Sequence, residues 1–296
     1  MIKLFWNTHN LKKTITEDKD IKKKEAVEFK WGIYHKKHSN VWIYEILKKI
    51  EYDVIDSKQA LEKEDILIIV DSNPEKKIEI YNDLKQACSK IFLFHLGDES
   101  GAYDLSKVYN NFNYVWRTFC SNKYFKNNHV TCIPIGYKSG LENKQENERK
   151  YKWAFTGTPH KSSRHDLLFQ FSDIKPFFCH KTEKFDEKVI SVNEMSEVLS
   201  STEFMPCPNG FFHPETYRLY EALQCGCIPI VEDAYKYYDR LFPSNPFIKV
   251  GKWIDAKAII KNWKENQIKE KQSECNNWWN NYKINLQEMV KNKITQ

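Results

Sequence analysis

Short hydrophobic runs alternate with segments of helical spacing along the first half of the chain. Residues 65–72, DILIIVDS, form a continuous aliphatic run, as in strands buried within a parallel sheet. Residues 41–50, VWIYEILKKI, place apolar side chains at helical intervals and end in a basic turn. The same patterns predict a helix at 76–89 and strands at 2–6, 52–57, 114–120 and 130–137, and residues 90–100 predict a strand that runs into a polar loop. Such alternation favours a parallel sheet with helices on both faces.

A polar, charged segment without periodicity, residues 138–150, separates this half from a second series of the same kind. Strands are predicted at 152–157, 175–181, 204–208, 227–231 and 246–251. Helices are predicted at 163–171, 193–201 and 215–225, with one or two more over 256–293. The second series therefore predicts another parallel sheet, joined to the first by the linker 138–150.

The expected fold class is α/β, with two doubly wound Rossmann-like domains that face each other across a cleft. We assign residues 1–140 to the first domain and 151–255 to the second, and expect helices in 256–296 to pack back onto the first. Ligands of such folds bind beyond the carboxyl ends of the strands. A cleft between two such domains suits a reaction between two substrates.

The composition indicates a soluble chain with ample core material and a basic N-terminal region. Hydrophobic residues make up 41% of the chain, and its longest aliphatic run, Ile66–Val70, is far too short to span a membrane. The N-terminus lacks the apolar segment of a secretion signal, so we expect a cytoplasmic protein. Residues 1–50 hold twelve lysines and six acidic residues, which predicts a lysine-rich face for an acidic acceptor or for peripheral membrane contact. No nucleic-acid-binding motif accompanies these lysines, so nucleic acid is not an expected partner.

The cysteines and histidines argue against a metal centre or a disulfide framework. None of the eight cysteines forms a Cys-x-x-Cys pair, and several fall within predicted strands, so we expect reduced, mostly buried thiols. Asp18 and Asp20 have Asp-x-Asp spacing, but they lie in a lysine-rich stretch and not behind an apolar strand. The closely spaced histidines lack recognisable co-ligands: His35, His38, His160 and His165. We therefore expect no metal and no cofactor.

The strongest chemical signal lies in residues 207–231, CPNGFFHPETYRLYEALQCGCIPIV. A loop opens at residues 208–210, a helix begins near Pro214, and a strand follows the helix. The free N–H groups and the dipole of such a helix N-terminus attract phosphate, and Arg218 one turn in adds a charge-assisted contact. Glu221, three residues further on the same face, can accept hydrogen bonds from a ribose diol. The competing interpretation is a core helix with a surface ion pair between Arg218 and Glu221.

A second segment of strand, glycine-containing loop and helix start lies at residues 154–168, AFTGTPHKSSRHDLL. Thr156 and Gly157 offer hydroxyl and backbone N–H groups in the loop. Lys161 and Arg164 bring positive charge to the helix entrance. Only five of the 46 basic residues are arginines, so each arginine hints at a need for a planar, bidentate cation. Two helix starts of this kind, each with an arginine, suit a nucleotide diphosphate.

A third cluster, HLGDE at residues 95–99, follows a predicted strand of the first domain. Transfer of a group to a hydroxyl needs a carboxylate or imidazole that removes the hydroxyl proton during the attack. Asp98 is the first choice for this base, Glu99 the second, and His9, in the loop after the first strand, the third. The alternative for each acidic residue is loop capping, because acidic residues after glycine often form turns.

These residues resemble the exostosin-like glycosyltransferases (glycosyltransferase family 47), and especially the branch of the ribitol xylosyltransferases. In residues 207–231, a loop, an arginine on a helix, Glu-Ala-Leu, a small-residue turn and a proline-containing strand follow the family's donor-domain pattern. Three further segments support the resemblance: FTGTPHKSSR at 155–164, HLGDE at 95–99 and CIPIGYKSG at 132–140. The similarity extends over roughly residues 90–230.

The resemblance implies a GT-B fold and an inverting, metal-independent glycosyltransferase. The donor would be a UDP-sugar, such as UDP-xylose or UDP-glucuronic acid, and the acceptor a hydroxyl of a glycan or a polyol phosphate. By matching positions, Arg164 and Arg218 would hold the diphosphate and Glu221 the ribose. The residues expected at the donor site are Thr156, Gly157, Lys161, Arg164, Asn209, Gly210, Glu215, Thr216, Tyr217, Arg218 and Glu221. The chain lacks the membrane anchor of the family's Golgi enzymes, which favours a cytoplasmic enzyme that builds a bacterial or viral glycan.

Other functions fit the same residues. A GT-B transferase outside this family, such as a fucosyltransferase-like enzyme, would use a GDP-sugar. A non-catalytic sugar- or nucleotide-binding module would bind UDP without turning over a donor. Titration with UDP, GDP and CMP separates the two transferases, and donor turnover separates an enzyme from a binding module.

Overall fold

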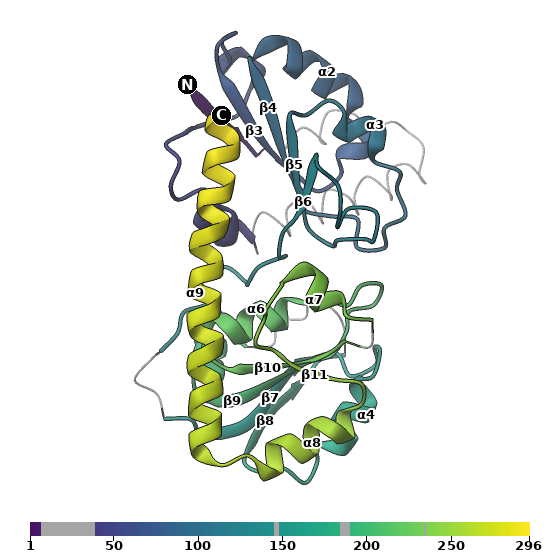
Figure 1. Cartoon of the computed structure of the whole chain (residues 1–296), viewed down its shortest axis with the longest axis vertical. Coiled ribbons are helices and arrows are strands. Elements are labelled where there is room, and N and C mark those ends of the chain that lie inside the picture. Colours follow the sequence, from purple (N-terminus) through teal and green to yellow (C-terminus); the bar gives the residue numbers. More distant parts are fainter. Residues whose placement is uncertain (7–38, 145–147, 184–189, 234) are drawn as a thin grey trace. The chain divides into compact units, whose positions relative to one another are not determined.

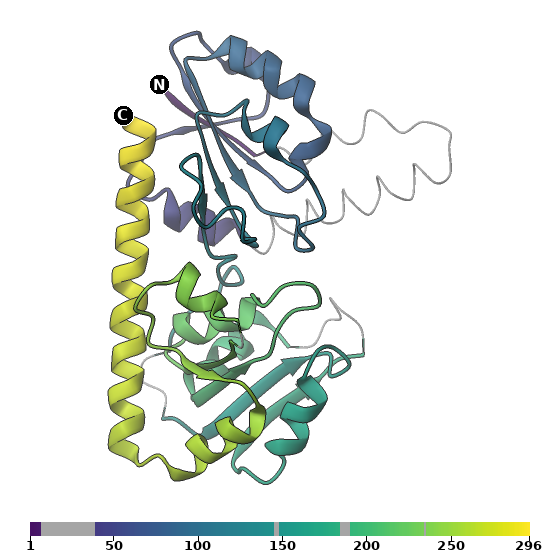
Figure 2. The same cartoon turned by 45° about the vertical axis from the view of Figure 1, so that its right-hand side comes forward.

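The computed structural model describes residues 1–6, 39–144, 148–183, 190–233 and 235–296 (Figure 1, Figure 2). Within it the chain divides into two compact units. Unit 1 comprises Met1–Pro134 together with Leu286–Gln296, and unit 2 comprises Ile135–Asn285. Each unit contains one parallel sheet, so the prediction of two Rossmann-like α/β domains is confirmed at this level. None of the helices in the described ranges is long and apolar enough to cross a membrane.

Unit 1 is built on a six-stranded parallel sheet with the order β2-β1-β3-β4-β5-β6. Its strands are β1 (Ile2–Phe5), β2 (Asp53–Ile55), β3 (Ile66–Asp71), β4 (Lys90–His95), β5 (Tyr114–Arg117) and β6 (Val130–Cys132). Its helical segments are residues 39–46, η2 (Lys58–Ala60), η3 (Pro74–Lys76), α2 (Ile78–Ala87) and α3 (Ser106–Tyr109). The aliphatic run predicted as a buried strand is β3, in which Leu67 and Ile68 are fully buried. The short helix α3 was not predicted, because its four residues are too few to show a helical period.

Unit 2 is built on a five-stranded parallel sheet with the order β11-β10-β9-β7-β8. Its strands are β7 (Tyr151–Gly157), β8 (Phe177–Lys181), β9 (Thr202–Cys207), β10 (Ile228–Glu232) and β11 (Ile248–Val250). Its helices are α4 (Arg164–Gln170), α5 (Val192–Ser200), α6 (Tyr217–Gln224), α7 (Tyr237–Leu241) and α8 (Trp253–Asn262). Helices α6 and α7 lie on one face of the sheet and α4 and α8 on the other (Figure 1).

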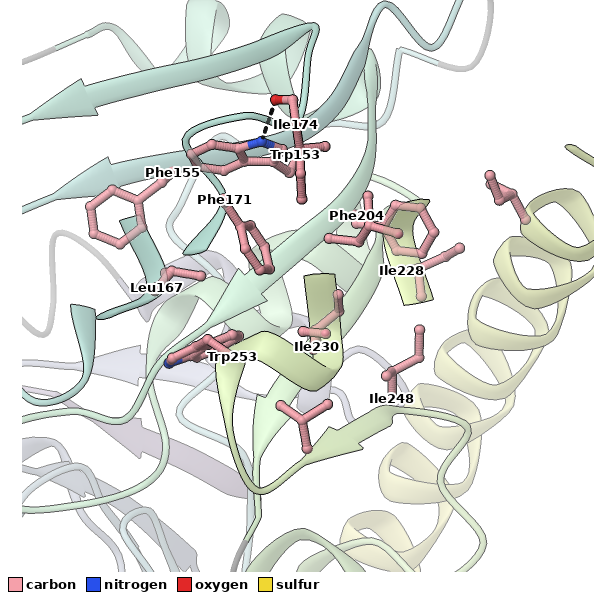
Figure 3. Close-up of a cluster of buried hydrophobic side chains, with 14 residues drawn as sticks. Trp153, Phe155, Leu167, Phe171, Ile174, Phe204, Ile228, Ile230, Ile248 and Trp253 are labelled. Carbon is pink, nitrogen blue, oxygen red and sulfur yellow. Dashed lines mark hydrogen bonds between the residues drawn. The ribbon is translucent and has the colours of Figure 1, made fainter. Parts of the chain in front are cut away.

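The hydrophobic core of unit 2 includes a cluster between its sheet and helices α4 and α8 (Figure 3). Trp153 and Phe155 project from β7, and Leu167 of α4 and Trp253 of α8 pack into the same cluster, each at most 1% exposed. Burying a side chain of this size stabilises the fold by about 1.5–3 kcal/mol. The core therefore fixes α4, and with it the loop that joins β7 to α4.

The strand order of unit 2 contains a topological switch point between β7 and β9. From β7 the chain moves to β8 on one side, and it then returns to β9, β10 and β11 on the other side. In open parallel sheets, ligands bind in the crevice outside the carboxyl ends of the strands at such a point. In unit 2 this location lies beyond Gly157, at the end of β7, and Cys207, at the end of β9.

The C-terminal helix α9 (Glu265–Thr295), yellow in Figure 1, contributes residues to both units. In unit 2, Trp279 is 1% exposed and lies against Tyr220 of α6, with ring centroids 5.9 Å apart. In unit 1, Gln287 donates a hydrogen bond of 3.0 Å to Glu45. The one or two helices predicted over residues 256–293 are thus α8 and α9.

One pair of cysteines departs from the expectation of reduced thiols. Cys120 and Cys132 form a disulfide in unit 1, with Cα atoms 5.5 Å apart. Strands β5 and β6 are neighbours, and their carboxyl ends bring the two residues together, which spacing in the sequence does not reveal. The expectation was wrong for this pair and is confirmed for the remaining free cysteines: Cys88, Cys179, Cys207, Cys225, Cys227 and Cys275.

Candidate functional site

The candidate site lies in unit 2, where two loops meet beyond the switch point of the sheet. The loop of residues 158–163 joins β7 to α4, and the loop of residues 208–216 joins β9 to α6. Lys161 of the first loop lies over the Phe211 ring of the second, with its ammonium nitrogen 5.7 Å from the ring centroid. The N-terminus of α6 therefore opens at the edge of the sheet where the topology places a ligand.

Arg218, in the first turn of α6, reaches across the switch point to the end of β7. Its Nε and Nη2 atoms donate hydrogen bonds of 3.0 and 2.5 Å to the carbonyl oxygen of Thr156. A Cβ atom on Gly157 would lie 2.2 Å from Nη2, and Gly157 has a φ of +127°, so this position requires glycine. Burial lowers the pKa of Arg218, and the negative charge of Glu221 offsets part of this effect. The arrangement fixes a cation at the end of β7 with a neutral carbonyl as its hydrogen-bond acceptor.

Glu221 lies one turn further along α6 and is 8% exposed. Burial raises its pKa, and the positive charges of Arg218 and Lys138 offset part of the rise. A surface ion pair with Arg218, the alternative raised by the sequence, does not describe this buried carboxyl group.

Two buried oxygen atoms of the loop that leads into α6 have no protein partner in the part of the chain that the structure describes. Thr216 is the N-cap residue and is 9% exposed, yet its hydroxyl caps none of the helix N–H groups. Thr216 Oγ1 and Asn209 Oδ1 are both buried without a hydrogen-bond partner among the described residues. Buried polar atoms are normally paired, so these two oxygen atoms are available to a ligand that binds beside the helix N-terminus. In the same loop, the Gly210 N–H donates to the His213 carbonyl at 2.8 Å.

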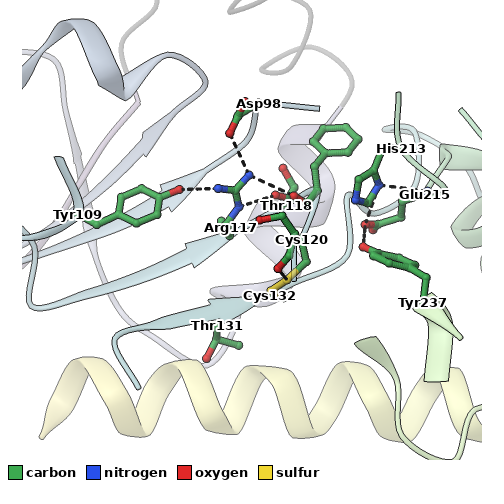
Figure 4. Close-up of a disulfide and its surroundings, with 12 residues drawn as sticks. Asp98, Tyr109, Arg117, Thr118, Cys120, Thr131, Cys132, His213, Glu215 and Tyr237 are labelled. Atoms are coloured by element: carbon green, nitrogen blue, oxygen red, sulfur yellow. Dashed lines mark hydrogen bonds and ion pairs between the residues drawn. A yellow bond between two sulfur atoms is a disulfide. The ribbon is translucent and has the colours of Figure 1, made fainter. Parts of the chain in front are cut away.

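Glu215, a predicted donor-site residue, belongs to a buried network of its own (Figure 4). Its carboxylate accepts hydrogen bonds from the Ile135 N–H at 2.9 Å, from the Tyr237 hydroxyl at 2.9 Å and from the Tyr220 hydroxyl. Burial raises its pKa to about 7, although these hydrogen bonds favour the charged form. At 2% exposure, Glu215 fixes the loop that leads into α6.

The loop after β7 is held largely by its own contacts. Arg164 is 5% exposed, and its Nη1 donates to the carbonyl and hydroxyl oxygens of Thr158 at 2.9 and 3.1 Å. Thr156 brings its carbonyl to Arg218, and its hydroxyl lies 4.0 Å from the sulfur of Met195. Tyr217, half-buried, begins α6 directly after Thr216.

Glu232, at the end of β10, was missed by sequence reasoning. Its Oε2 accepts hydrogen bonds from the Ser163 hydroxyl at 2.5 Å and from the Asn209 N–H at 3.4 Å. Ser163 in turn accepts one from the Trp253 indole at 2.8 Å. An acidic residue directly after the buried run of β10 was the available signal, since strand ends in such folds carry functional side chains.

The predicted bases Asp98 and Glu99 lie after β4 in unit 1. The Asp98 side chain is 2% exposed, and its Oδ2 lies 3.4 Å from Nη2 of the fully buried Arg117 (Figure 4). Its Oδ1 accepts a hydrogen bond of 2.9 Å from the Ala102 N–H. Glu99 is half-buried on the same turn, and His9, the third predicted base, lies outside the described residues. Arg117 and its contacts were also missed, because an arginine that ends an apolar strand has no characteristic motif.

No group of three or more histidine, cysteine or acidic side chains suited to a metal ion occurs within the described ranges. Absence of a metal requirement remains a prediction for this protein.

Comparison with known proteins gives one family. The profile of the RXYLT1 C-terminal domain matches residues 137–296, more than half of the chain. No curated protein matches the chain significantly. The matched region contains the loop of residues 158–163, the loop of residues 208–216 and α6. The chain thus belongs to the RXYLT1 C-terminal domain family, which confirms its resemblance to the ribitol xylosyltransferase branch of the exostosin-like glycosyltransferases.

Proposed function

We propose that this protein is an inverting glycosyltransferase that moves a sugar from a UDP-sugar to a hydroxyl of a glycan or polyol-phosphate acceptor. The observation that carries the proposal is the position of Arg218. It is a half-buried cation held at the β7–β9 switch point by a neutral carbonyl, beside the N-terminus of α6. The family match supports a glycosyltransferase, and the geometry suits a diphosphate leaving group.

Each group at the edge of the sheet has a role in this proposal. Arg218 and the first N–H groups of α6 bind the diphosphate and stabilise its growing charge as the sugar departs. Thr216 and Asn209 complete the site with two buried oxygen atoms that have no partner among the described residues. The Thr216 hydroxyl donates a hydrogen bond to a phosphate oxygen, and Asn209 Oδ1 accepts one from a sugar hydroxyl. Glu221 accepts hydrogen bonds from the ribose diol. Lys161 adds positive charge from the facing loop, so the reaction needs no metal ion.

Arg164, Glu215 and Gly210 support this site from behind. Arg164 and Glu215 are each at most 5% exposed and make hydrogen bonds within their own loops, so they shape the two loops. Gly210 closes the turn toward His213. Tyr217, half-buried at the start of α6, and the backbone of Gly157 line the entrance.

In the proposed reaction, the acceptor oxygen attacks the anomeric carbon on the face opposite the diphosphate. A carboxylate in the loop of residues 96–101 takes the hydroxyl proton during this attack. The bond from the anomeric carbon to the diphosphate oxygen breaks, and its electron pair leaves with UDP. A single displacement of this kind inverts the anomeric configuration. We also propose that the two units adopt a GT-B arrangement, which brings donor and acceptor together.

The test combines nucleotide titration with donor turnover. Calorimetry with UDP, GDP and CMP should show binding of UDP in preference to the other two nucleotides. Incubation with UDP-xylose, UDP-glucuronic acid, UDP-galactose and UDP-N-acetylglucosamine should consume one donor, and NMR of the product should show inverted anomeric configuration. Tight GDP binding without UDP binding would indicate a fucosyltransferase-like enzyme. UDP binding with no donor turnover would indicate a non-catalytic module.

Membrane contact and cytoplasmic localisation are separate proposals. Nine of the twelve lysines in residues 1–50 that motivate membrane contact lie within 7–38, outside the described residues. The Cys120–Cys132 disulfide is more typical of an oxidising compartment than of the cytoplasm. Flotation with vesicles that contain anionic lipid, with and without high salt, tests the membrane contact, and thiol labelling of the protein in its native cells tests the compartment.

A further inference from the structure

The loop that follows β4 in unit 1 is held in an unusual conformation by Asp98. This residue has a φ of +61°, in the left-handed region that non-glycine residues rarely occupy. Its Oδ1 accepts a hydrogen bond of 2.9 Å from the Ala102 N–H, four residues further along the chain. The Gly101 N–H also donates to the Asp98 carbonyl at 3.0 Å. Asp98 therefore closes a turn that contains Glu99.

Arg117 anchors this turn to the sheet. It ends β5, is fully buried, and lies 3.4 Å from Asp98 Oδ2. Its Nε and Nη2 donate hydrogen bonds of 3.1 Å to the carbonyls of Thr118 and Phe119. The strand and the segment after it therefore hold the guanidinium in one position, and that position fixes Asp98.

A second set of contacts holds the other side of the Arg117 guanidinium. Its Nη1 donates to the Tyr109 hydroxyl at 3.2 Å, and this hydroxyl lies 2.7 Å from His95 Nδ1. The Tyr124 ring lies 4.3 Å from the guanidinium carbon. A fully buried guanidinium needs a nearby negative charge, and Asp98 supplies a carboxylate to it.

A general base must present a carboxylate oxygen to the acceptor hydroxyl. The Asp98 side chain is 2% exposed, and its two oxygens face Arg117 and the Ala102 N–H. Glu99 is the next residue on the same turn and is only half-buried. We infer that Asp98 and Arg117 are positioning residues that shape this turn, and that Glu99 is the general base. The inference rests on the proposed glycosyltransferase function, and it names the residue that activates the acceptor and the two residues that position it.

The proton balance of the step supplies the test. The oxygen of water or of an acceptor hydroxyl attacks the anomeric carbon, and the Glu99 carboxylate takes the proton from this oxygen. The bond from the anomeric carbon to the diphosphate breaks in the same step. Azide attacks as an anion and releases no proton, so transfer of the sugar to azide needs no general base. Loss of the base therefore lowers the ratio of donor hydrolysis to glycosyl azide formation. A variant that only displaces the loop slows both reactions and leaves this ratio unchanged.

The experiment uses the full chain with UDP-xylose, or with whichever donor of the panel the wild-type protein consumes. Hydrolysis and glycosyl azide formation are measured for wild type, Glu99→Gln, Asp98→Asn and Arg117→Lys. Glu51→Gln, at an exposed glutamate of the same unit, is the matched control. Each variant is assayed well below its melting temperature, so that loss of folded protein does not contribute. UDP affinity is measured in parallel as a readout of unit 2.

We expect Glu99→Gln to slow hydrolysis by roughly 10²–10⁴-fold and to leave azide transfer at the wild-type rate. Asp98→Asn and Arg117→Lys should slow both reactions by the same factor and lower the melting temperature, with UDP affinity unchanged. Glu51→Gln should behave as wild type.

Loss of hydrolysis with retained azide transfer in Asp98→Asn would make Asp98 the base and overturn the inference. Wild-type rates in Glu99→Gln, or in both Asp98→Asn and Arg117→Lys, would overturn it as well. A wild-type protein that binds no UDP and consumes no donor overturns the proposed function itself, and the assignment of a base then fails with it. The wild-type measurements therefore distinguish the two failures.

Discussion

The two units each place an arginine at the carboxyl edge of a parallel sheet, and they compensate its charge differently. Arg117 of unit 1 is fully buried, with the Asp98 carboxylate 3.4 Å away. Arg218 of unit 2 is half-buried and donates to a neutral carbonyl oxygen, that of Thr156. Glu221, three residues further along α6, raises the pKa of Arg218 through its charge.

The difference separates a structural cation from a binding cation. A buried guanidinium that has its own carboxylate is already compensated, and a second anion would gain little by approaching it. A guanidinium that is held by a carbonyl keeps its charge available and is pre-oriented for bidentate contact with phosphate. The comparison therefore favours Arg218 as the anion-binding residue of the proposed function and Arg117 as a residue that shapes its loop.

The largest expected effect is on stability, from Arg117→Met. Removing one partner of a buried ion pair typically lowers the free energy of unfolding by about 3–5 kcal/mol, because the other charge is left buried and uncompensated. Chemical denaturation of the variant and of wild type measures the difference. UDP affinity, which reports unit 2, should remain at its wild-type value.

A double variant sharpens this prediction. Arg117→Met combined with Asp98→Asn removes both charges, so it should recover part of the stability lost in the single variant. Purely additive losses would show that the two side chains do not interact, and the proposed compensation of Arg117 would then be wrong.

The sequence predicted the features that depend on residues close together in the chain, and it did not predict those that depend on distant residues. The aliphatic run of β3 and the helical spacing of the tail are local patterns, and both produced the expected elements. The motif at residues 207–231 likewise located α6, because its loop, helix and strand are contiguous in the chain. Helix α3 and the disulfide were not predicted, because the first is too short for a period and the second depends on neighbouring strands.

The site shows the same limit. The sequence selected Arg218 and Glu221 from their spacing on one helix face. It could not show that Arg218 reaches the Thr156 carbonyl across the switch point, since 62 residues separate the two. Nor could it show that Glu215 is enclosed by hydrogen bonds, because the partners Ile135 and Tyr237 come from distant segments. The sequence could therefore select candidate residues, and it could not show which of them are enclosed by other side chains.

The next largest effect is expected from Arg218→Met, in binding and not in stability. Loss of a charge-assisted hydrogen bond weakens UDP binding by about 1.5–3 kcal/mol, which is roughly a 10- to 150-fold rise in Kd. The free energy of unfolding should change by only about 1 kcal/mol, because one neutral carbonyl loses its donor. Arg240→Ala, at an exposed arginine of the same unit, is the matched control.

Calorimetric titration with UDP and denaturation of the same samples test both parts of this prediction. Wild-type UDP affinity in Arg218→Met would remove the anion site from the switch point. A loss of stability as large as that of Arg117→Met would show that the two arginines do not differ in the way the comparison requires.

The smallest expected effect is a pH dependence that arises from Glu215 in unit 2. Its pKa is raised from an ordinary value of 4.5 to about 7 in the folded protein. Between these two values the folded state binds more protons than the unfolded state, so stability is highest at the acidic end and falls as the pH rises. The contribution of this group has a slope of at most about 1.4 kcal/mol per pH unit within that window.

Glu215→Gln removes this slope and keeps an amide oxygen that can accept the hydrogen bonds from Ile135 and Tyr220. The free energy of unfolding, measured at pH 5, 6 and 7, should therefore fall less steeply in the variant than in wild type. His213 Nδ1 lies 3.9 Å from the carboxylate, so His213→Asn measures its share of the slope. Identical pH profiles of wild type and Glu215→Gln would mean that Glu215 is as charged when folded as when unfolded. The hydrogen bonds to the Glu215 carboxylate would then outweigh the effect of its burial, and Glu215 would resemble Asp98 as a buried acidic residue that stays charged in the folded protein.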